Sequence, residues 1–374
     1  MLGSNPPLAP TLTAMAGRIL RPSLRIVVDV SPLSRPRTGI GNYIRGMVAG
    51  LAEAAGGEHE LVAFGPSGPR GRRRIREALA GLPVELRLPL LPHAVRTAWS
   101  RAQRLPVERV AGPLDVFHFS DWMYPPQRGG VRATTVHDLV PLRFPEWVEP
   151  ETARMHGRKY EHAARTCDRI FVNSRFTGRD VVELLGVPEE RVVVAYPGID
   201  QRFRPGGDAA DLGGPYVLGV STLEPRKNLP ALVAAFRVLK KRRPELTLAL
   251  AGLAGWEREP LAAEGVRLLG FVSDEELARL YRGASAFAYP SRFEGFGIPV
   301  VEALASGAPT VVSSHPSLDE ACGDAAVRAD PDEPETFADA LEQALDAPRG
   351  SGIEHASRFT WRACGEAVLA GYLD

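Results

Sequence analysis

The sequence predicts an α/β protein built from two doubly wound domains that face each other across a cleft. The chain has 374 residues, about twice the length of a common domain. Short apolar runs alternate with segments of helical spacing in both halves, as is typical of parallel sheets covered by helices on both faces. A Gly- and Pro-rich stretch at 201–215 separates the halves and is typical of a linker.

The first half contains the elements of one such domain. Apolar runs that fit buried strands lie at 25–30, 60–65, 84–89, 115–120, 133–138, 169–174 and 191–198. Helical spacing predicts helices at 42–54, 151–167 and 175–185. We therefore expect an N-terminal Rossmann-like domain over 25–200. The scattered Pro, Gly and Ser residues of 1–24 predict a disordered N-terminal extension.

The second half repeats the rhythm more regularly. Strands are predicted at 216–221, 246–252, 266–271, 285–290 and 310–314. Helices are predicted at 229–242, 274–283, 299–306 and 335–346. This half is expected to form a C-terminal Rossmann-like domain over 201–374. Ligands of such sheets bind beyond the carboxyl ends of the strands, so the cleft between the domains is the expected site.

Composition argues against several classes of protein. No run of 18 or more uncharged apolar residues occurs, and the first 24 residues lack an apolar signal core, so neither a membrane span nor a secretory leader is predicted. Three cysteines without metal-ligand spacing favour the reducing cytoplasm. Residues 1–200 carry 27 Lys and Arg against 20 Asp and Glu, whereas 201–374 carry 18 against 25. The first half is therefore expected to meet something anionic.

The segment SRFEGFGIPVVEALASG, residues 291–307, directly follows a predicted strand. Gly295 and Gly297 let the backbone approach a ligand, and the helix start that follows offers N–H groups to an anion such as phosphate. Glu294 and Glu302 would repel phosphate alone, so they indicate a ligand that carries hydroxyl groups beside its phosphates. The alternative is a solvated loop carboxylate together with a charge that complements the helix dipole.

A second candidate site is STLEPRKN, residues 221–228, after the strand predicted at 216–221. Arg226 and Lys227 stand where two adjacent cations could neutralise a diphosphate. The alternative is an ordinary basic pair on the surface.

These segments belong to a set of motifs that resembles one known family. The set comprises RTGIGNYI (37–44), TVHDLVPL (135–142), the segment 172–200, EPRKN (224–228), LLGFVSDEEL (268–277) and EGFGIPVVE (294–302). Over residues 25–374 the chain is similar to the retaining glycosyltransferases of family 4, which have the GT-B architecture. The TGIG and LEPRKN segments look closest to those of bacterial mannosyltransferases.

The resemblance implies transfer of a sugar from a nucleoside-diphosphate sugar, with GDP-mannose a candidate, to an acceptor hydroxyl. The residues that it implies for catalysis are His137, Glu294, Arg226 and Lys227. Those that it implies for donor binding are Gly41, Ser221, Arg226, Lys227, Phe271, Val272, Glu294, Gly295, Phe296, Gly297, Ile298 and Glu302. Many relatives carry an arginine at the position of Ser221, and Arg226 is expected to supply the missing charge. From its place in the sequence alone, His137 could equally be a structural histidine.

The resemblance also sets expectations about partners: it implies that the N-terminal domain binds the acceptor and that the C-terminal domain binds the nucleotide sugar. The acceptor is expected to be a saccharide, a lipid-linked molecule or a small molecule, and no cofactor or metal is expected to be required. The final helix is expected to pack back toward the N-terminal domain. The basic run 69–77 is either a solvated face or a point of contact with anionic lipid, at the inner membrane face of a cytoplasmic protein. No aromatic residues interleave it, so nucleic acid is not expected.

Other motifs in the sequence suggest alternative functions. The segment TGIGNYI has Ile44 where a dinucleotide-binding fingerprint needs a third small residue, which argues against an oxidoreductase. The DPD segment at 330–332 is predicted to start a helix, with Asp332 and Glu335 in a capping arrangement, and not to bind a metal. Two alternative functions stay open: a non-hydrolysing nucleotide-sugar epimerase and a catalytically inactive nucleotide-sugar-binding scaffold.

Overall fold

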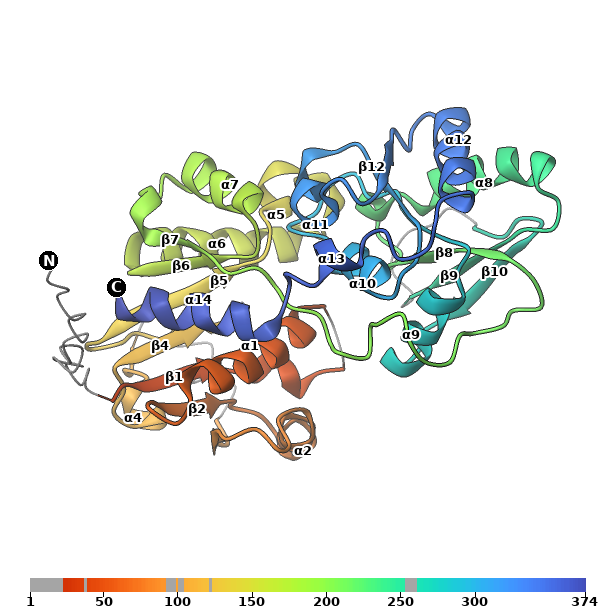
Figure 1. Cartoon of the computed structure of the whole chain (residues 1–374). Coiled ribbons are helices and arrows are strands. Elements are labelled where there is room, and N and C mark those ends of the chain that lie inside the picture. Colours follow the sequence, from red (N-terminus) through yellow and green to blue (C-terminus); the bar gives the residue numbers. More distant parts are fainter. Residues whose placement is uncertain (1–22, 37–38, 92–98, 100–103, 121–122, 253–260) are drawn as a thin grey trace, which may run out of the picture.

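The chain folds around two parallel sheets that lie side by side (Figure 1). This computed structural model describes residues 23–36, 39–91, 99, 104–120, 123–252 and 261–374. The extension expected at 1–24 lies almost wholly outside the described residues. The two-sheet α/β prediction is confirmed, and its reason is local: continuous apolar runs suit strands that are buried on both faces.

The first sheet has seven strands in the order β3-β2-β1-β4-β5-β6-β7. They are β1 (Arg25–Asp29), β2 (Glu60–Phe64), β3 (Glu85–Arg87), β4 (Val116–Phe119), β5 (Val131–Val136), β6 (Arg169–Val172) and β7 (Val192–Val194). One face packs on α1 (Gly39–Ala55), α2 (Pro69–Ala78) and α14 (Trp361–Leu373). The other packs on α4 (Glu108–Ala111), α6 (Pro150–Thr166) and α7 (Arg175–Leu185). The short helix α5 (Val140–Arg143) follows β5.

The second sheet has six strands in the order β10-β9-β8-β11-β12-β13. They are β8 (Tyr216–Val220), β9 (Thr247–Ala251), β10 (Val266–Gly270), β11 (Ala286–Tyr289), β12 (Thr310–Ser313) and β13 (Val327–Ala329). One face packs on α9 (Asp274–Gly283), α10 (Ile298–Ala305), α11 (Asp319–Cys322) and α13 (Ile353–Ala356). The other packs on α8 (Leu229–Arg242) and α12 (Pro334–Leu345). The three-residue strand β13 was not predicted, because it is too short to show a pattern.

The chain crosses between the sheets twice. Residues 195–215 lead from β7 to β8, and they are not a bare linker, since Phe203 and Ala210 are buried in the core of the second sheet. The final helix α14 then returns and lies along α1 beside the first sheet (Figure 1). None of the helices in the described residues combines the length and apolarity that crossing a membrane requires.

Glycines allow α14 to approach α1 closely. A Cβ atom on Gly50 would lie 1.7 Å from the carbonyl oxygen of Trp361, and a Cβ atom on Gly365 would lie 2.1 Å from the carbonyl carbon of Gly50. Where the two crossings meet, a Cβ atom on Gly198 would lie 2.1 Å from the backbone nitrogen of Trp361. The return of the C-terminus therefore depends on positions without side chains.

We predict that Gly50→Ala destabilises the protein by about 3 kcal/mol, because the added methyl group meets backbone that cannot turn aside. Thermal and denaturant unfolding would measure the loss. Gly157→Ala in α6 is the matched control, since no atom lies within 4 Å of its added Cβ. That control should be neutral or gain about 0.5–1 kcal/mol. Equal stability of the two variants would contradict the close packing of α14 on α1.

Candidate active site

Loops from both sheets converge at the carboxyl ends of their strands. The loop after β8 carries Arg226 and Lys227, and the loop after β11 carries Glu294. These strands are neighbours in the sheet, so side chains 67 positions apart in the chain come together. From the first domain, the loop after β5 brings His137 to the same place.

Glu294 binds both cations through separate oxygens. Its Oε1 accepts from Lys227 Nζ at 2.6 Å, and its Oε2 accepts from Arg226 Nη1 at 2.9 Å. The Tyr289 hydroxyl is 2.9 Å from both Lys227 Nζ and Glu294 Oε1. Arg226 also binds Glu224 at 2.9 Å. The predicted residues thus meet, as paired charges and not as the free cations that the sequence suggested.

The protonation of this cluster follows from its pairing. Burial alone would raise the pKa of Glu294, but the positive charges of Lys227 and Arg226 outweigh it and lower that pKa to about 2. Burial and the charge of Arg226 lower the pKa of Lys227. The Glu294 carboxylate acts in the opposite direction and offsets part of this shift. Glu294 is therefore a carboxylate at every physiological pH.

The Glu294 loop touches the first domain. A Cβ atom on Gly295 would lie 1.8 Å from the carbonyl oxygen of His137, so only glycine fits between the two loops. The His137 ring packs edge-on against Tyr43 of α1, with ring centroids 4.7 Å apart. Gly295 and His137, which lie in separate predicted motifs, are thus in contact across the domain boundary.

The residues after Gly295 start α10. Gly297 is the N-cap and has a φ of +103°, a left-handed backbone that disfavours any side chain. The Phe296 ring is buried against Tyr196 and Phe359, with centroid distances of 5.9 Å and 5.1 Å. Phe296 can thus offer a ligand its backbone, while its side chain belongs to the core.

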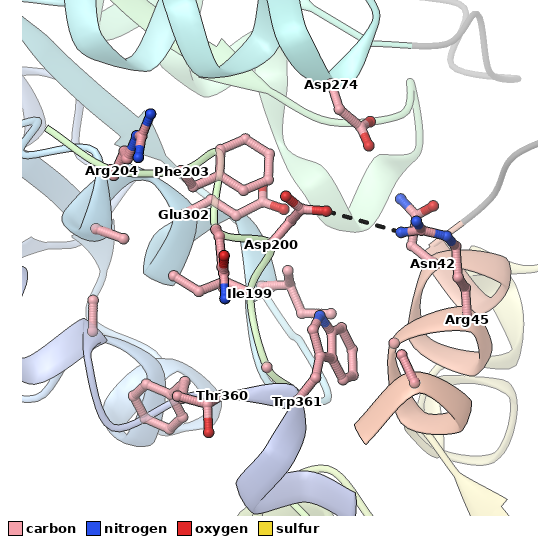
Figure 2. Close-up of a pocket in the computed structure, with 18 of the residues that line it drawn as sticks. Asn42, Arg45, Ile199, Asp200, Phe203, Arg204, Asp274, Glu302, Thr360 and Trp361 are labelled. Carbon is pink, nitrogen blue, oxygen red and sulfur yellow. Dashed lines mark ion pairs between the residues drawn. The ribbon is translucent and has the colours of Figure 1, made fainter. Parts of the chain in front are cut away.

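A cavity of about 930 Å³ lies between α1, the 198–205 crossing and the start of α10, the helix that follows the Glu294 loop. Glu302, Asp200 and Asp274 project toward it, and Ile298 lines it (Figure 2). Across the cavity Arg45 of α1 approaches Asp200 at 3.9 Å (Figure 2). The cavity therefore combines an apolar wall with a few convergent polar groups, as ligand sites do.

Glu302 has the opposite electrostatic environment to Glu294. Burial raises its pKa to about 8, and the negative charges of Asp274 and Asp200 add to the shift. The Tyr281 hydroxyl donates to it at 3.3 Å. At neutral pH a carboxyl group in this state can both donate to and accept from a hydroxyl of a ligand.

Comparison with family models covers most of the chain. Residues 37–203 match the model "Glycosyltransferase Family 4", and residues 202–363 match "Glycosyl transferases group 1". The chain belongs to the family 4 glycosyltransferases. The models meet at 202–203, within the crossing that leads from the first sheet to the second.

Individual relatives of this glycosyltransferase agree with that assignment. The O-antigen chain mannosyltransferase B of Escherichia coli is 29% identical over 93% of this chain and 99% of its own. The D-inositol 3-phosphate glycosyltransferase of Thermobispora bispora is 29% identical over 80% of each chain. Serotype-specific mannosyltransferase WbdA of Escherichia coli is 26% identical over 63% of this chain but only 32% of its own length.

Solved structures show the same fold. The sucrose-phosphate synthase of Thermosynechococcus elongatus has a TM-score of 0.65 at 20% identity, over 93% of this chain and 98% of its own. The Anabaena HepE protein, solved in complex with UDP and glucose, has a TM-score of 0.61 at 17% identity, over 93% of this chain and 94% of its own. The glycosyltransferase therefore has the GT-B architecture.

Of the twelve predicted donor-binding residues, Ile298 and Glu302 line the 930 Å³ cavity and ten do not. Six of these ten lie in the loop cluster described above, and the other four lie elsewhere. Gly41 is buried at the start of α1 and lines a smaller cavity of about 430 Å³ beside it. Ser221 follows β8, and its hydroxyl is buried without a hydrogen-bond partner in the described part of the chain. Val272 packs on the core of the second sheet, whereas Phe271 is 61% exposed. Their role in donor binding stays a prediction.

The predicted capping of α12 by Asp332 and Glu335 is wrong. The N-cap is Glu333, without a side-chain hydrogen bond, and Pro334 stands at the first turn. Asp332 instead accepts from Asn228 at 3.1 Å and from Arg292 at 2.7 Å. Side chains from the loops after β8 and β11 both donate to this carboxylate. These two loops are brought together only by the tertiary structure.

Sequence reasoning missed several cavity residues: Asn42, Arg45, Asp200, Asp274 and Trp361. Asp274 had a usable signal, because it lies within the segment 268–277 that carries part of the family resemblance. Trp361 had none, since only the return of α14 brings it beside α1.

We predict that Glu302 makes stability fall with pH between about 4.5 and about 8. In this window the folded protein keeps a proton on Glu302 that the unfolded chain has released. The free energy of unfolding therefore falls as pH rises. Glu302→Gln cannot titrate. The melting temperature of wild type relative to Glu302→Gln should therefore decrease by several degrees from pH 5 to pH 9.

Thermal unfolding of both proteins over that range gives the measurement, because other titrating groups cancel in the difference. Glu354→Gln serves as the control, since Glu354 is exposed near the C-terminus. A pH-independent gap between wild type and Glu302→Gln would show that the carboxyl group keeps its ordinary pKa.

Proposed function

We propose that this glycosyltransferase transfers mannose from GDP-mannose to an acceptor hydroxyl, with retention of configuration at the anomeric carbon. The observation that carries the proposal is the Glu294–Arg226–Lys227 cluster at the strand ends, together with the cavity that contains Glu302. A sugar nucleotide presents hydroxyls, a diphosphate, a ribose and a base in one line. These residues offer carboxylates for the hydroxyls and cations for the phosphates.

Asp274 supports a guanine base. Guanine carries two parallel N–H donors on one edge, and a carboxylate can accept both in a bidentate pair. Asp274 lines the same cavity as Glu302 (Figure 2). Support for mannose comes from the relatives, two of which are named as mannosyltransferases.

The cluster suggests how its residues act during transfer. When the donor binds, its diphosphate takes Arg226 and Lys227 as partners, and Glu294 turns to the sugar hydroxyls. The bond between the anomeric carbon and the phosphate oxygen then breaks, the acceptor hydroxyl oxygen bonds to that carbon, and the hydroxyl proton passes to the departing phosphate oxygen. The nucleoside diphosphate leaves with the electron pair, and the two cations stabilise the charge that develops on it. We infer that no metal ion is required, which an assay in EDTA would test.

A thermal-shift screen against GDP-, UDP-, ADP- and dTDP-sugars tests the donor, because a specific ligand raises the melting temperature in proportion to the logarithm of its saturation. GDP-mannose should stabilise most. A larger shift with a UDP-sugar would overturn the assignment of the base while leaving the sugar-nucleotide class intact.

Lys227→Met should reduce kcat with GDP-mannose roughly a hundredfold or more, about 3 kcal/mol of transition-state stabilisation. Methionine keeps most of the side-chain volume and removes the charge. Release of GDP in the presence of acceptor gives the measurement, and circular dichroism confirms folding. Lys241→Met is the control, since Lys241 is exposed at the end of α8. A folded Lys227→Met enzyme of normal activity would reject the phosphate role.

We further propose that the acceptor is anionic or anchored in an anionic membrane, on the ground of α2. This helix holds the basic run predicted from the sequence, and its only buried residue is Ile75. Arg70, Arg73, Arg74 and Arg76 are exposed. Arg74 donates to the Ser34 carbonyl at 3.3 Å, so the other three are better choices for substitution.

Replacing Arg70, Arg73 and Arg76 by Ser should weaken binding to anionic vesicles, since each basic side chain near such a surface contributes about 1 kcal/mol. Binding of wild type should fall with salt, which screens charges over about 10 Å. Cosedimentation at low and high salt measures both effects. Substitution of the exposed basic residues Arg237, Lys241 and Arg358 in the second domain is the control. If the wild-type protein does not cosediment with anionic vesicles at low salt, the membrane proposal fails.

A further inference from the structure

A short segment of the second domain reaches across to α7 of the first. The segment comprises η5 (Pro316–Leu318) and α11. Its Glu320 carboxylate accepts from the backbone N–H groups of Arg175 and Phe176, at 2.9 Å and 2.8 Å. These N–H groups open α7 and have no partner within the helix, and the helix dipole favours a negative charge there. The Tyr196 hydroxyl donates to the same carboxylate at 2.6 Å.

The first turn of α7 in turn holds the loop that carries Glu294. The Thr177 hydroxyl donates to the Gly295 carbonyl at 3.0 Å, and the Ser174 hydroxyl donates to the same oxygen at 2.5 Å. Both hydroxyls belong to the first domain, whereas Gly295 belongs to the second. The peptide bond that follows Gly295 is therefore oriented by groups from the other side of the cleft.

The same segment also holds the other side of Glu294. Ser317 Oγ accepts from the Glu294 N–H at 3.0 Å, and Ser317 lies three positions before Glu320. The backbone on one side of Glu294 is thus tied to η5, and that on the other side is tied to α7. Glu320 links η5 and α7 directly.

Aromatic rings fill the space around these hydrogen bonds. Phe293 packs against Phe144 and Phe176 of the first domain, with centroid distances of 5.3 Å and 5.6 Å. It also lies 5.5 Å from the His315 ring, which precedes η5. An apolar seam of this kind keeps water from competing for the buried hydroxyl–carbonyl contacts.

We propose that Thr177 and Glu320 are positioning residues that form a clasp between the domains and hold Glu294 against the His137 loop for transfer. The inference rests on the proposed role of Glu294 at the donor sugar. The clasp acts through Gly295 and the segment 315–322, and neither Thr177 nor Glu320 lines the cavity that contains Glu302. It should therefore control turnover more than affinity for the nucleotide, since misplacing a reacting group lowers the rate without removing binding contacts.

Steady-state kinetics with GDP-mannose separate these effects. Thr177→Val keeps the shape and removes the hydroxyl, and should lower kcat about tenfold while the donor KM stays within about twofold. Thr177→Ser restores the hydroxyl and should restore most of kcat. Glu320→Gln should lower kcat in the same way, because the helix start loses its charged partner. Thr166→Val is the matched control, since the Thr166 hydroxyl donates to the His162 carbonyl within α6.

A rise in donor KM at unchanged kcat would overturn the positioning role, as would an equal loss of kcat in Thr166→Val. Failure of Thr177→Ser to recover activity would overturn it too, because a hydroxyl at this position is what the clasp requires.

Domain separation gives a readout that needs no activity. Dyes on Glu190→Cys in the first domain and Gln343→Cys in the second would report it, because both positions are exposed while Cys167, Cys322 and Cys364 are buried. Thr177→Val and Glu320→Gln should each shift energy transfer toward a more open population, and Thr166→Val should not. If no donor is turned over, the proposed function fails while this shift still supports the clasp. Unchanged energy transfer in both clasp variants would overturn the clasp itself.

Discussion

The buried ion pairs between Glu294 and its two cations are the contact on which the site depends. A carboxylate left without partners in this environment would cost on the order of several kcal/mol, so the loops after β8 and β11 must stay together. That requirement follows from the sheet order, in which β8 and β11 are neighbours. Ion pairing as well as strand pairing thus holds the loops after β8 and β11 in place.

The two glutamates of the motif show how environment gives one side chain two uses. Glu294 is surrounded by cations and hydroxyls, which keep it ionised. Glu302, eight positions later on α10, faces Asp200 and Asp274 and has a raised pKa. A ligand with a diphosphate between two hydroxylated rings suits such a divided site. The spacing in the sequence places both carboxylates near the end of β11. The surrounding charges then set the pKa of each one.

The domain interface is built from backbone as much as from side chains. Gly295 leaves no room for a Cβ atom beside His137, and Gly50 and Gly198 let α1 and the crossing approach Trp361. Because backbone packed this closely can adopt few other arrangements, these contacts restrict the position of one domain relative to the other. Hydroxyl–carbonyl bonds from Ser174 and Thr177 add direction to that packing.

The sequence by itself determined the alternation of strands and helices, because apolar runs and helical spacing are local properties. It also indicated the chemistry of the two main loops and the GT-B resemblance, since these reside in contiguous motifs. Only the tertiary structure decided which charges pair. Glu294 finds Lys227 across 67 positions, and Asp332 binds Asn228 and Arg292 where a helix cap was expected. Partner choice among these charged side chains depends on strand order, which brings the loops after β8 and β11 together and is not written in any local pattern.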